Sequence, residues 1–294
     1  MEVLRAAIPP LLGLLTVWLV DIETRRRGLE PPWFQIPSGA DTARRVTARV
    51  RRLLALSLLW LVLWLGVFLP LGSLGVEREL DLSRLSRFDL FLLHLLLMSC
   101  LVLWYLCGYI PRFGSERQRR EGGWIAQFGL RSESILREIG IGLAVGIVAW
   151  LVVIAALLAI GIAVWWIGGD EWLPQQPPEL IPWIAALPVG VRLLISLSAG
   201  VVEEAFFRGF LQPRIGLWLS SALFVIAHAS YEQPLMLVGV SMLSLVYAGL
   251  VLWRQSIWAA VVAHSLFDAV QLLVVIPAAL RVLPGGADGT IVFL

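Results

Sequence analysis

Apolar residues along this chain form eight long runs that are separated by shorter polar segments. The runs cover approximately residues 3–20, 53–71, 88–110, 138–167, 186–212, 217–230, 235–253 and 256–277. A helix of about 20 apolar residues crosses a hydrocarbon core about 30 Å thick, and the second, third, fourth and eighth runs reach that length. The pattern therefore predicts an all-α fold, a polytopic transmembrane helix bundle of about eight spans.

Two of the runs are less typical of a full membrane span. Pro9 and Pro10 interrupt the first run, so the sequence leaves open whether residues 3–20 cross the membrane. This run has neither a basic leader nor a small-residue cleavage site, which favours a retained anchor over a signal peptide. The sixth run has roughly fourteen residues before the polar segment 231–234 and is short for a complete crossing.

Composition supports a membrane protein. Hydrophobic residues make up 59% of the 294 residues and charged residues 15%, whereas a soluble domain carries about 25% charged residues. We therefore predict an integral membrane protein, and we place it in a prokaryotic plasma membrane. All 23 basic residues are arginines. The absence of lysine excludes a lysine Schiff base and a Ser-Lys dyad.

Arginines gather in two of the segments between the runs. Eight lie between the first and second runs and six between the third and fourth, whereas segment 168–182 has three acidic residues and no basic one. By the positive-inside rule, the arginine-rich segments are cytoplasmic. We interpret them as determinants of orientation that contact lipid headgroups. Because no nucleic-acid-binding motif accompanies them, we predict no nucleic-acid partner.

The last third of the chain places ionisable side chains inside strongly apolar runs. A charged side chain is costly at the centre of a bilayer and persists there when it is paired, hydrated or functional. At 1.5 Å per residue, the two adjacent glutamates lie roughly 15 Å from the cytoplasmic end of their helix, and two histidines on later helices lie at a similar depth. We therefore predict one polar, catalytic site in the cytoplasmic half of the bilayer. Its members are Glu203, Glu204, Arg208, His228, His264 and Asp268.

Spacing within each helix assigns these residues to faces. Glu204 and Arg208 are four residues apart with the acid first, which is the favoured order for an ion pair on one helix face. Glu203 points about 100° away from Glu204 and is therefore available for chemistry. His264 and Asp268 are also four residues apart and present two ligands or hydrogen-bonding groups on one face.

The surroundings of the histidines suggest different roles for them. Phe224 lies one turn before His228, where we expect it to pack against the imidazole. His94 has no polar neighbour at helical spacing, and we interpret it as a core or helix-interface residue. Interhelical hydrogen bonding without catalysis is the alternative interpretation of Glu203, His228 and His264.

Three motifs in this region resemble a known family. Glu-Glu-x-x-x-Arg at 203–208, Phe-x-x-x-His at 224–228 and His-x-x-x-Asp at 264–268 are similar to the motifs of the CPBP intramembrane proteases. These are the CAAX-processing and bacteriocin-processing enzymes, also called Abi-type, and they include the type II CAAX prenyl endopeptidases. The resemblance covers roughly residues 186–277. It suggests N-terminal transmembrane helices with arginine-rich loops over 1–137, a protease core over 138–280 and a tail over 281–294.

The resemblance implies peptide-bond hydrolysis inside a membrane cavity. In such enzymes the residue matching Glu203 activates a water with help from the one matching His228. His264 and Asp268 would bind the developing oxyanion or help to hold a metal. Eukaryotic members more often have Asn where this chain has Asp268, and an aspartate suits metal ligation or orientation of His264 better than an oxyanion role. The catalytic residues implied are Glu203, Glu204, His228, His264 and Asp268, supported by Arg208 and Phe224.

The sequence leaves a metal cofactor open. Two histidines and one or two carboxylates can fill three positions of a catalytic Zn²⁺ site and leave one for water. The ligands would be Glu203, His228, His264 and Asp268. The chain has no His-Glu-x-x-His motif, and a metal-free mechanism would use the same residues.

Two other classes of function compete with a protease. One is a catalytically inactive membrane module, such as an immunity or partner-stabilising protein that keeps the same fold. The other is a proton-coupled transporter, which would spread its polar groups through the full membrane depth, whereas here they share one level. The partners we expect are membrane lipid and a membrane-associated peptide or protein. Prenylated CAAX proteins, pheromone or bacteriocin precursors and the termini of other membrane proteins are all candidate substrates.

Overall fold

In the computed structural model, the chain folds into a bundle of helices. The structure describes residues 2–30, 39, 41–73, 86–108, 129–169, 180–229 and 233–282. These residues form helices and short connections and contain no strand. The predicted all-α class is therefore confirmed.

The helices follow the predicted apolar runs. Three of them, α2, α9 and α12, continue without a break into a π-helical segment, labelled η. A π-helix closes its hydrogen bonds five residues apart and is therefore wider than an α-helix. The elements are α1 (Glu2–Arg26), α2 (Thr42–Val62), η1 (Leu63–Phe68), α3 (Leu69–Ser73), α4 (Asp89–Gly108), α7 (Ile135–Gly168), α8 (Leu180–Ala185), α9 (Val189–Glu203), η4 (Glu204–Leu211), α10 (Gln212–Ala227), α11 (Pro234–Arg254), α12 (Trp258–Val270), η6 (Gln271–Val275) and α13 (Ile276–Val282).

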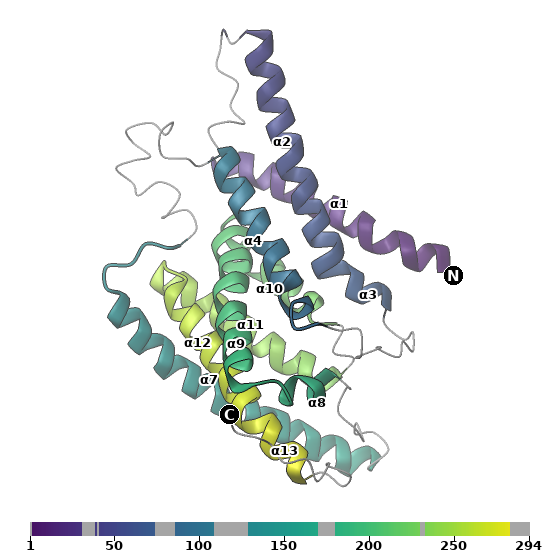
Figure 1. Ribbon diagram of the computed structural model, residues 1–294, viewed down its shortest axis with the longest axis vertical. Helices are drawn as coiled ribbons and strands as arrows, with labels where there is room; N and C mark the ends of the chain where they lie inside the picture. The colour runs from purple at the N-terminus through teal and green to yellow at the C-terminus, as the bar shows by residue number, and fades with distance from the viewer. Residues whose placement is uncertain are drawn as a thin grey trace.

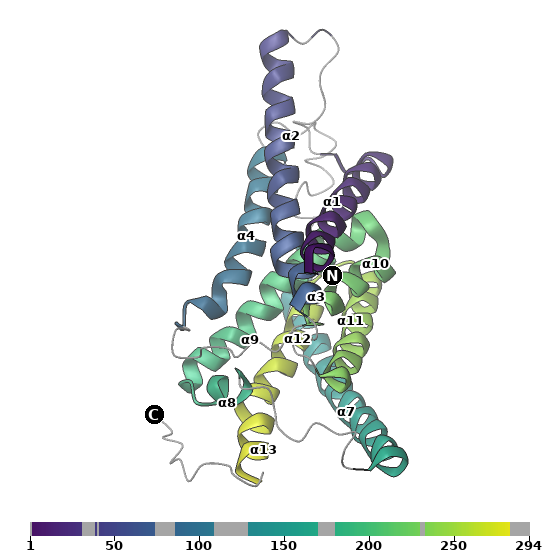
Figure 2. The same cartoon turned by 90° about the vertical axis from the view of Figure 1, so that its right-hand side faces the viewer.

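The N-terminal helices and the later helices occupy different ends of the molecule. Figure 1 shows α1, α2 and α4 in the upper half of the view and α7, α12 and α13 in the lower half, with α9 and α10 between them. The turned view in Figure 2 keeps this order and shows α2 projecting beyond its neighbours. α9 and α10 therefore occupy the middle of the bundle.

Five of the described helices are long and apolar enough to cross a membrane. They cover Ala6–Arg26, Thr42–Leu71, Ile135–Gly168, Pro234–Arg254 and Trp258–Arg281, and Asp89–Trp104 adds a shorter apolar helix. Many large apolar side chains on these helices are exposed, as lipid-facing surfaces require. The protein is therefore an integral membrane protein.

The first helix continues through its two prolines. Pro9 and Pro10 both lie inside α1, although a proline in a helix interior removes a backbone N–H and crowds the preceding turn. The indole Nε1 of Trp60 on α2 donates a hydrogen bond to the carbonyl oxygen of Pro10 at 3.0 Å, which ties the two helices together at this point. The run that the prolines interrupt in the sequence is thus one helix of sufficient length to cross.

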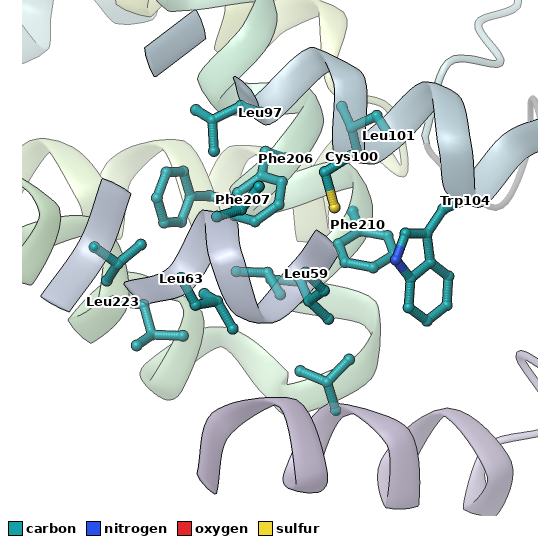
Figure 3. Packing of buried hydrophobic residues seen from close by; sticks show 14 of the residues in the cluster. Leu59, Leu63, Leu97, Cys100, Leu101, Trp104, Phe206, Phe207, Phe210 and Leu223 are labelled. Carbon is teal, nitrogen blue, oxygen red and sulfur yellow. The ribbon is translucent and has the colours of Figure 1, made fainter. Parts of the chain in front are cut away.

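Aromatic side chains of η4 join the N-terminal helices to the rest of the bundle (Figure 3). Phe206, Phe207 and Phe210 are buried in one cluster with side chains of α2, η1 and α4. Trp104 of α4 meets Phe210 edge-on, with 4.9 Å between ring centroids, and its Nε1 donates to the carbonyl oxygen of Ala55 at 3.1 Å. The segment that follows the two glutamates is therefore packed directly against the first half of the chain.

Glycines allow three of the later helices to approach one another closely. A Cβ at Gly142 of α7 would lie 2.6 Å from the carbonyl oxygen of Ala259 on α12. A Cβ at Gly200 of α9 would lie 2.8 Å from the carbonyl oxygen of Val261 and would collide with Oγ of Ser265, both on α12. α9, which ends at Glu203, and α12, which carries His264, thus approach each other closely along their backbones.

We expect the substitution Gly200→Ala to destabilise the protein by about 1–3 kcal/mol, because the added methyl group overpacks the contact between α9 and α12. The free energy of unfolding in mixed micelles would measure this effect. The matched control is Gly190→Ala on the same helix, where an added Cβ meets no atom within 4 Å. Equal stability of the two variants would contradict this packing.

The continuous helix formed by α9, η4 and the first turn of α10 ends at Gly216. Its φ of 82° and ψ of 169° are not helical, and they separate residues 212–215 from the helix that follows. A positive φ strains any residue with a Cβ, so glycine suits this reversal. The break lies between the fifth and sixth predicted spans, as the sequence indicated.

Three of the predicted features lie outside the residues that the structure describes. These are the arginine-rich segment over 111–128, the acidic residues over 170–179 and the tail over 283–294. The predicted division of the chain at residues 137 and 280 stays a prediction.

Candidate active site

The two adjacent glutamates lie at the junction of two helical forms. Glu203 is the last residue of α9 and Glu204 the first residue of η4. Both are buried, with exposed fractions of 8% and 0%. π-helical segments are rare and frequently occur at functional sites. Because consecutive helix residues point about 100° apart, the two carboxylates face different partners.

Two side chains, an imidazole and a guanidinium, contact the same carboxylate oxygen of Glu204. Nδ1 of His264 donates to its Oε1 at 2.9 Å, and Nη1 of Arg208 lies 3.2 Å from the same oxygen. Arg208 in turn donates from Nη2 to the backbone oxygen of Ser244 at 3.2 Å and to its hydroxyl oxygen at 3.0 Å. The predicted Glu204–Arg208 ion pair is present, and it is anchored to α11.

Aromatic rings surround the buried guanidinium of Arg208. Its Cζ lies 4.1 Å from the ring centroid of Phe224, and 5.9 Å and 5.8 Å from those of Phe207 and Tyr247. A cation over an aromatic face is attracted by the ring quadrupole, more strongly where water is excluded. The rings and Glu204 together stabilise the buried guanidinium charge.

Glu203 lies between two imidazoles from different helices. Nε2 of His94 on α4 is 3.4 Å from its Oε1, and Nε2 of His228 at the end of α10 is 3.9 Å from its Oε2. Oε2 is buried and accepts no hydrogen bond from the described residues. The 3.9 Å between Nε2 of His228 and Oε2 of Glu203 is too long for a direct hydrogen bond. One water molecule at about 2.8 Å from each of these two atoms could bridge them.

The orientation of His228 follows from its other ring nitrogen. Nδ1 lies 2.7 Å from the carbonyl oxygen of Phe224. A carbonyl only accepts hydrogen bonds, so Nδ1 carries a proton and Nε2 faces Glu203 with its lone pair in the neutral ring. The ring also packs against Phe224 as expected, with 4.6 Å between centroids and an angle of 35° between the ring planes.

His264 lies between two carboxylates and against a tyrosine ring. Nδ1 bonds to Glu204, and Nε2 lies 3.4 Å from Oδ2 of Asp268. Tyr247 stacks on the imidazole at a centroid distance of 5.1 Å. Asp268 is the more accessible of the two acids, with 28% of its side chain exposed. The imidazole is thus fixed in position by contacts on both nitrogens and on one face.

The structure brings the six predicted polar residues together in two adjoining sets of contacts, one around Glu203 and one around Glu204, and it adds residues that the sequence did not indicate. His94, which the sequence predicts to be a core or helix-interface residue, lies at a helix interface and contacts Glu203 there. An ionisable residue in an otherwise apolar span is a signal that could have identified it. Ser244 and Tyr247 gave no such signal, because neither residue type is unusual in an apolar helix.

The described residues include no group of three or more His, Cys, Asp or Glu side chains that could hold a metal ion. The four ligands considered from the sequence separate into two sets. Glu203 faces His94 and His228, whereas His264 faces Glu204 and Asp268. This donor arrangement does not fit a Zn²⁺ site, so we derive no step through a metal. A buried carboxylate paired with imidazoles can instead perform general acid–base chemistry.

Comparison with known proteins identifies a family for this region. Residues 185–270 match the family described as type II CAAX prenyl endopeptidase Rce1-like. All three motifs lie inside the match, so the predicted resemblance is confirmed for this part of the chain. The helix that carries His94 lies outside it.

A search of curated proteins found a relative that aligns with 79 residues of this chain. The uncharacterized protein YpbD of Bacillus subtilis (strain 168) is 32% identical over 79 residues, which are 26% of this chain and 42% of that protein. The matched segment therefore spans less than half of the relative. No solved structure matches the chain.

Proposed function

We propose, from the family match over residues 185–270 and the contacts at the two glutamates, that this protein is an intramembrane endopeptidase. It would hydrolyse a peptide bond of a membrane-associated protein or peptide. One observation carries the proposal. The carboxylate of Glu203 and the imidazole of His228 come from separate motifs, are largely buried, and lie 3.9 Å apart in a position to share a water.

The reaction would begin with that water. Glu203 accepts a proton from it, and Nε2 of His228 fixes the direction of its attack on the peptide carbonyl carbon. The new C–O bond gives a tetrahedral intermediate with a negatively charged oxygen. The proton then passes to the departing nitrogen as the C–N bond breaks, which leaves a new carboxyl terminus and a new amine.

The second half of the site would supply charge and orientation. With a proton on each nitrogen, the His264 imidazolium would stabilise the oxyanion through its positive charge, which acts strongly where water is excluded. Glu204 holds His264 through the 2.9 Å bond to Nδ1, and Arg208 holds Glu204. Asp268 contacts the other nitrogen of the ring, which suits a role in orienting His264.

We place the site in the cytoplasmic half of a prokaryotic plasma membrane. The positive-inside rule assigns four helix ends to the cytoplasm, and contacts between these ends support the assignment to one membrane face. Arg27 after α1 donates to the carbonyl oxygen of Pro213 at 3.2 Å, and Arg254 at the end of α11 pairs with Glu138 at the start of α7 at 2.7 Å. Ends that belong to one membrane face should meet in this way.

A comparison of protein termini would test the function. Cells that express the wild-type protein should contain new termini in membrane-associated proteins, and cells that express Glu203→Ala or His228→Ala at equal levels should lack them. A transporter or an inactive module predicts identical termini in all three strains. If both variants keep the full biological activity of the wild type, the protease proposal fails.

A purified assay would complement this test. Vesicle-bound peptides, one farnesylated with a C-terminal CAAX sequence and one a transmembrane peptide without a lipid, would separate the candidate substrate classes. Activity should survive exhaustive chelation, because no step in this mechanism uses a metal. Loss of activity that returns with added Zn²⁺ would contradict the metal-free mechanism.

A further inference from the structure

We propose that His94 is a positioning residue for Glu203, so that the N-terminal helices supply part of the active site. The inference rests on the proposed peptidase function. It concerns a residue of α4, which lies outside the segment that matches the family. The chain has three histidines, and with His94 all of them contact one of the two adjacent glutamates.

The contacts of His94 link both of its ring nitrogens to α9. Nε2 lies 3.4 Å from Oε1 of Glu203, and Nδ1 lies 3.0 Å from the hydroxyl oxygen of Ser198. That hydroxyl is also 3.0 Å from the carbonyl oxygen of Ile195, to which it can donate its proton. Ser198 then accepts from Nδ1 of His94, which completes the hydrogen bonds of the hydroxyl.

This arrangement places a proton between His94 and Glu203. When Nδ1 carries a proton toward Ser198, the neutral ring has only a lone pair at Nε2, and a carboxylate also only accepts. The contact is therefore favourable when one proton is shared, as an imidazolium beside a carboxylate or as a carboxylic acid beside an imidazole. The imidazolium–carboxylate form fixes Oε1 of Glu203 against α4 and also leaves Glu203 able to accept a proton from water.

Fixing Oε1 determines where the other oxygen points. With Oε1 held by His94, Oε2 is directed at Nε2 of His228, the position we assign to the reacting water. A catalytic base that is oriented by a third group is a recurring arrangement in hydrolytic enzymes. His94 would perform this role without touching the substrate.

Packing alone does not explain a histidine at this position. α4 has no charged residue after Asp89 and is otherwise almost entirely apolar. Phe91 meets the His94 ring edge-on at 6.3 Å between centroids, and a leucine would fill the same space at lower cost in a membrane. His228 at the end of α10 and His264 on α12 also interact electrostatically with Glu203. Arg208 on the adjoining η4 and Tyr247 on α11 do so as well, and Glu204 is the next residue in the chain.

Kinetics would distinguish positioning from packing. The probe is the farnesylated CAAX peptide or the unlipidated transmembrane peptide, whichever the wild type cleaves. His94→Leu should lower kcat about 10- to 100-fold, with KM changed less than twofold. This is the loss typical of residues that orient metal ligands, applied here to a residue that orients a base. His94→Gln, whose amide can still donate to Oε1, should recover much of that loss. The control Met98→Leu, one turn further along α4 in the same core, should stay within twofold of wild type.

Two further measurements should change only if His94 positions Glu203: the pH dependence of kcat/KM and the ¹⁵N signals of the histidine rings. A residue that only supports the fold would leave both unchanged. In His94→Leu the acidic limb of the kcat/KM profile should move to higher pH, since Glu203 loses a donor that favours its charged form. Independently of activity, ¹⁵N-histidine spectra contain three imidazoles. The substitution Glu203→Gln should change the His94 signals, identified by their loss in His94→Gln, while Met98→Leu leaves them in place.

The outcomes separate this inference from the proposed function. Unchanged His94 signals in Glu203→Gln, or a kcat within twofold of wild type in His94→Leu, would overturn the positioning role. If neither peptide is cleaved by the wild type, the peptidase proposal loses its support in these assays, and the spectra still decide whether His94 and Glu203 interact. A uniform loss of folded protein in His94→Leu, with no rescue of kcat in the folded His94→Gln, would show that His94 only supports the fold.

Discussion

Replacing Glu203 with glutamine is expected to lower kcat for peptide cleavage by about 10²- to 10⁴-fold, the contribution of a positioned general base. Glutamine has nearly the same shape and can still contact His94 and His228, but it cannot accept the proton of the attacking water. The fold should therefore persist while the reaction fails. Single-turnover rates on the vesicle-bound peptide would measure the loss.

The control for this variant is a glutamate away from the site. Glu133 is exposed just before α7, and Glu133→Gln should leave kcat unchanged within twofold. Helix content and thermal unfolding of Glu203→Gln should match the wild type. A Glu203→Gln enzyme that retains more than a tenth of the wild-type kcat would remove Glu203 from the role of base.

Replacing Arg208 with methionine is expected to cost about 3–5 kcal/mol of stability, because it leaves a buried charge without its partner. Arg208 is 1% exposed and Glu204 is fully buried, their contact is 3.2 Å, and without Arg208 the Glu204 carboxylate would keep only its bond to His264. Methionine keeps much of the side-chain volume, so the loss would reflect charge and hydrogen bonds. Denaturant titration in mixed micelles would measure it.

A double-mutant cycle isolates the pair. Glu204→Gln combined with Arg208→Met removes both charges, and this double variant should be more stable than Arg208→Met alone, since no unpaired carboxylate remains. Arg49→Met, at an exposed position on α2, serves as the control and should change stability by less than about 0.5 kcal/mol. Additive effects of the two site substitutions would argue against a coupled ion pair.

The proposed active site depends on both halves of the chain. The glutamates, His228 and His264 lie in the segment that matches the family, whereas the aromatic cluster beside them includes side chains of α2 and α4. A fragment limited to residues 185–270 would lack His94 and the apolar surface that covers Phe206 and Phe210. The first half therefore acts as more than an anchor in this interpretation.

Local patterns in the sequence were sufficient for the helices and for contacts within one helix. Hydropathy identified the apolar helices, because the lipid solvent selects apolar side chains along a whole helix, and five of the described helices are long and apolar enough to cross a membrane. The Glu204–Arg208 and Phe224–His228 contacts were predictable because residues four apart share a helix face. Local rules were less reliable at Pro9 and Pro10, where packing against Trp60 accompanies an unbroken helix.

Only the tertiary structure decided which side chains from different helices contact each other. The sequence placed three motifs at one depth, but depth does not fix the rotation of a helix about its axis. That rotation is set by packing, here by Gly142 and Gly200 against α12 and by the aromatic cluster on η4. For this reason His94 became visible as a partner of Glu203, and His264 as a partner of Glu204, only once the helices were packed together.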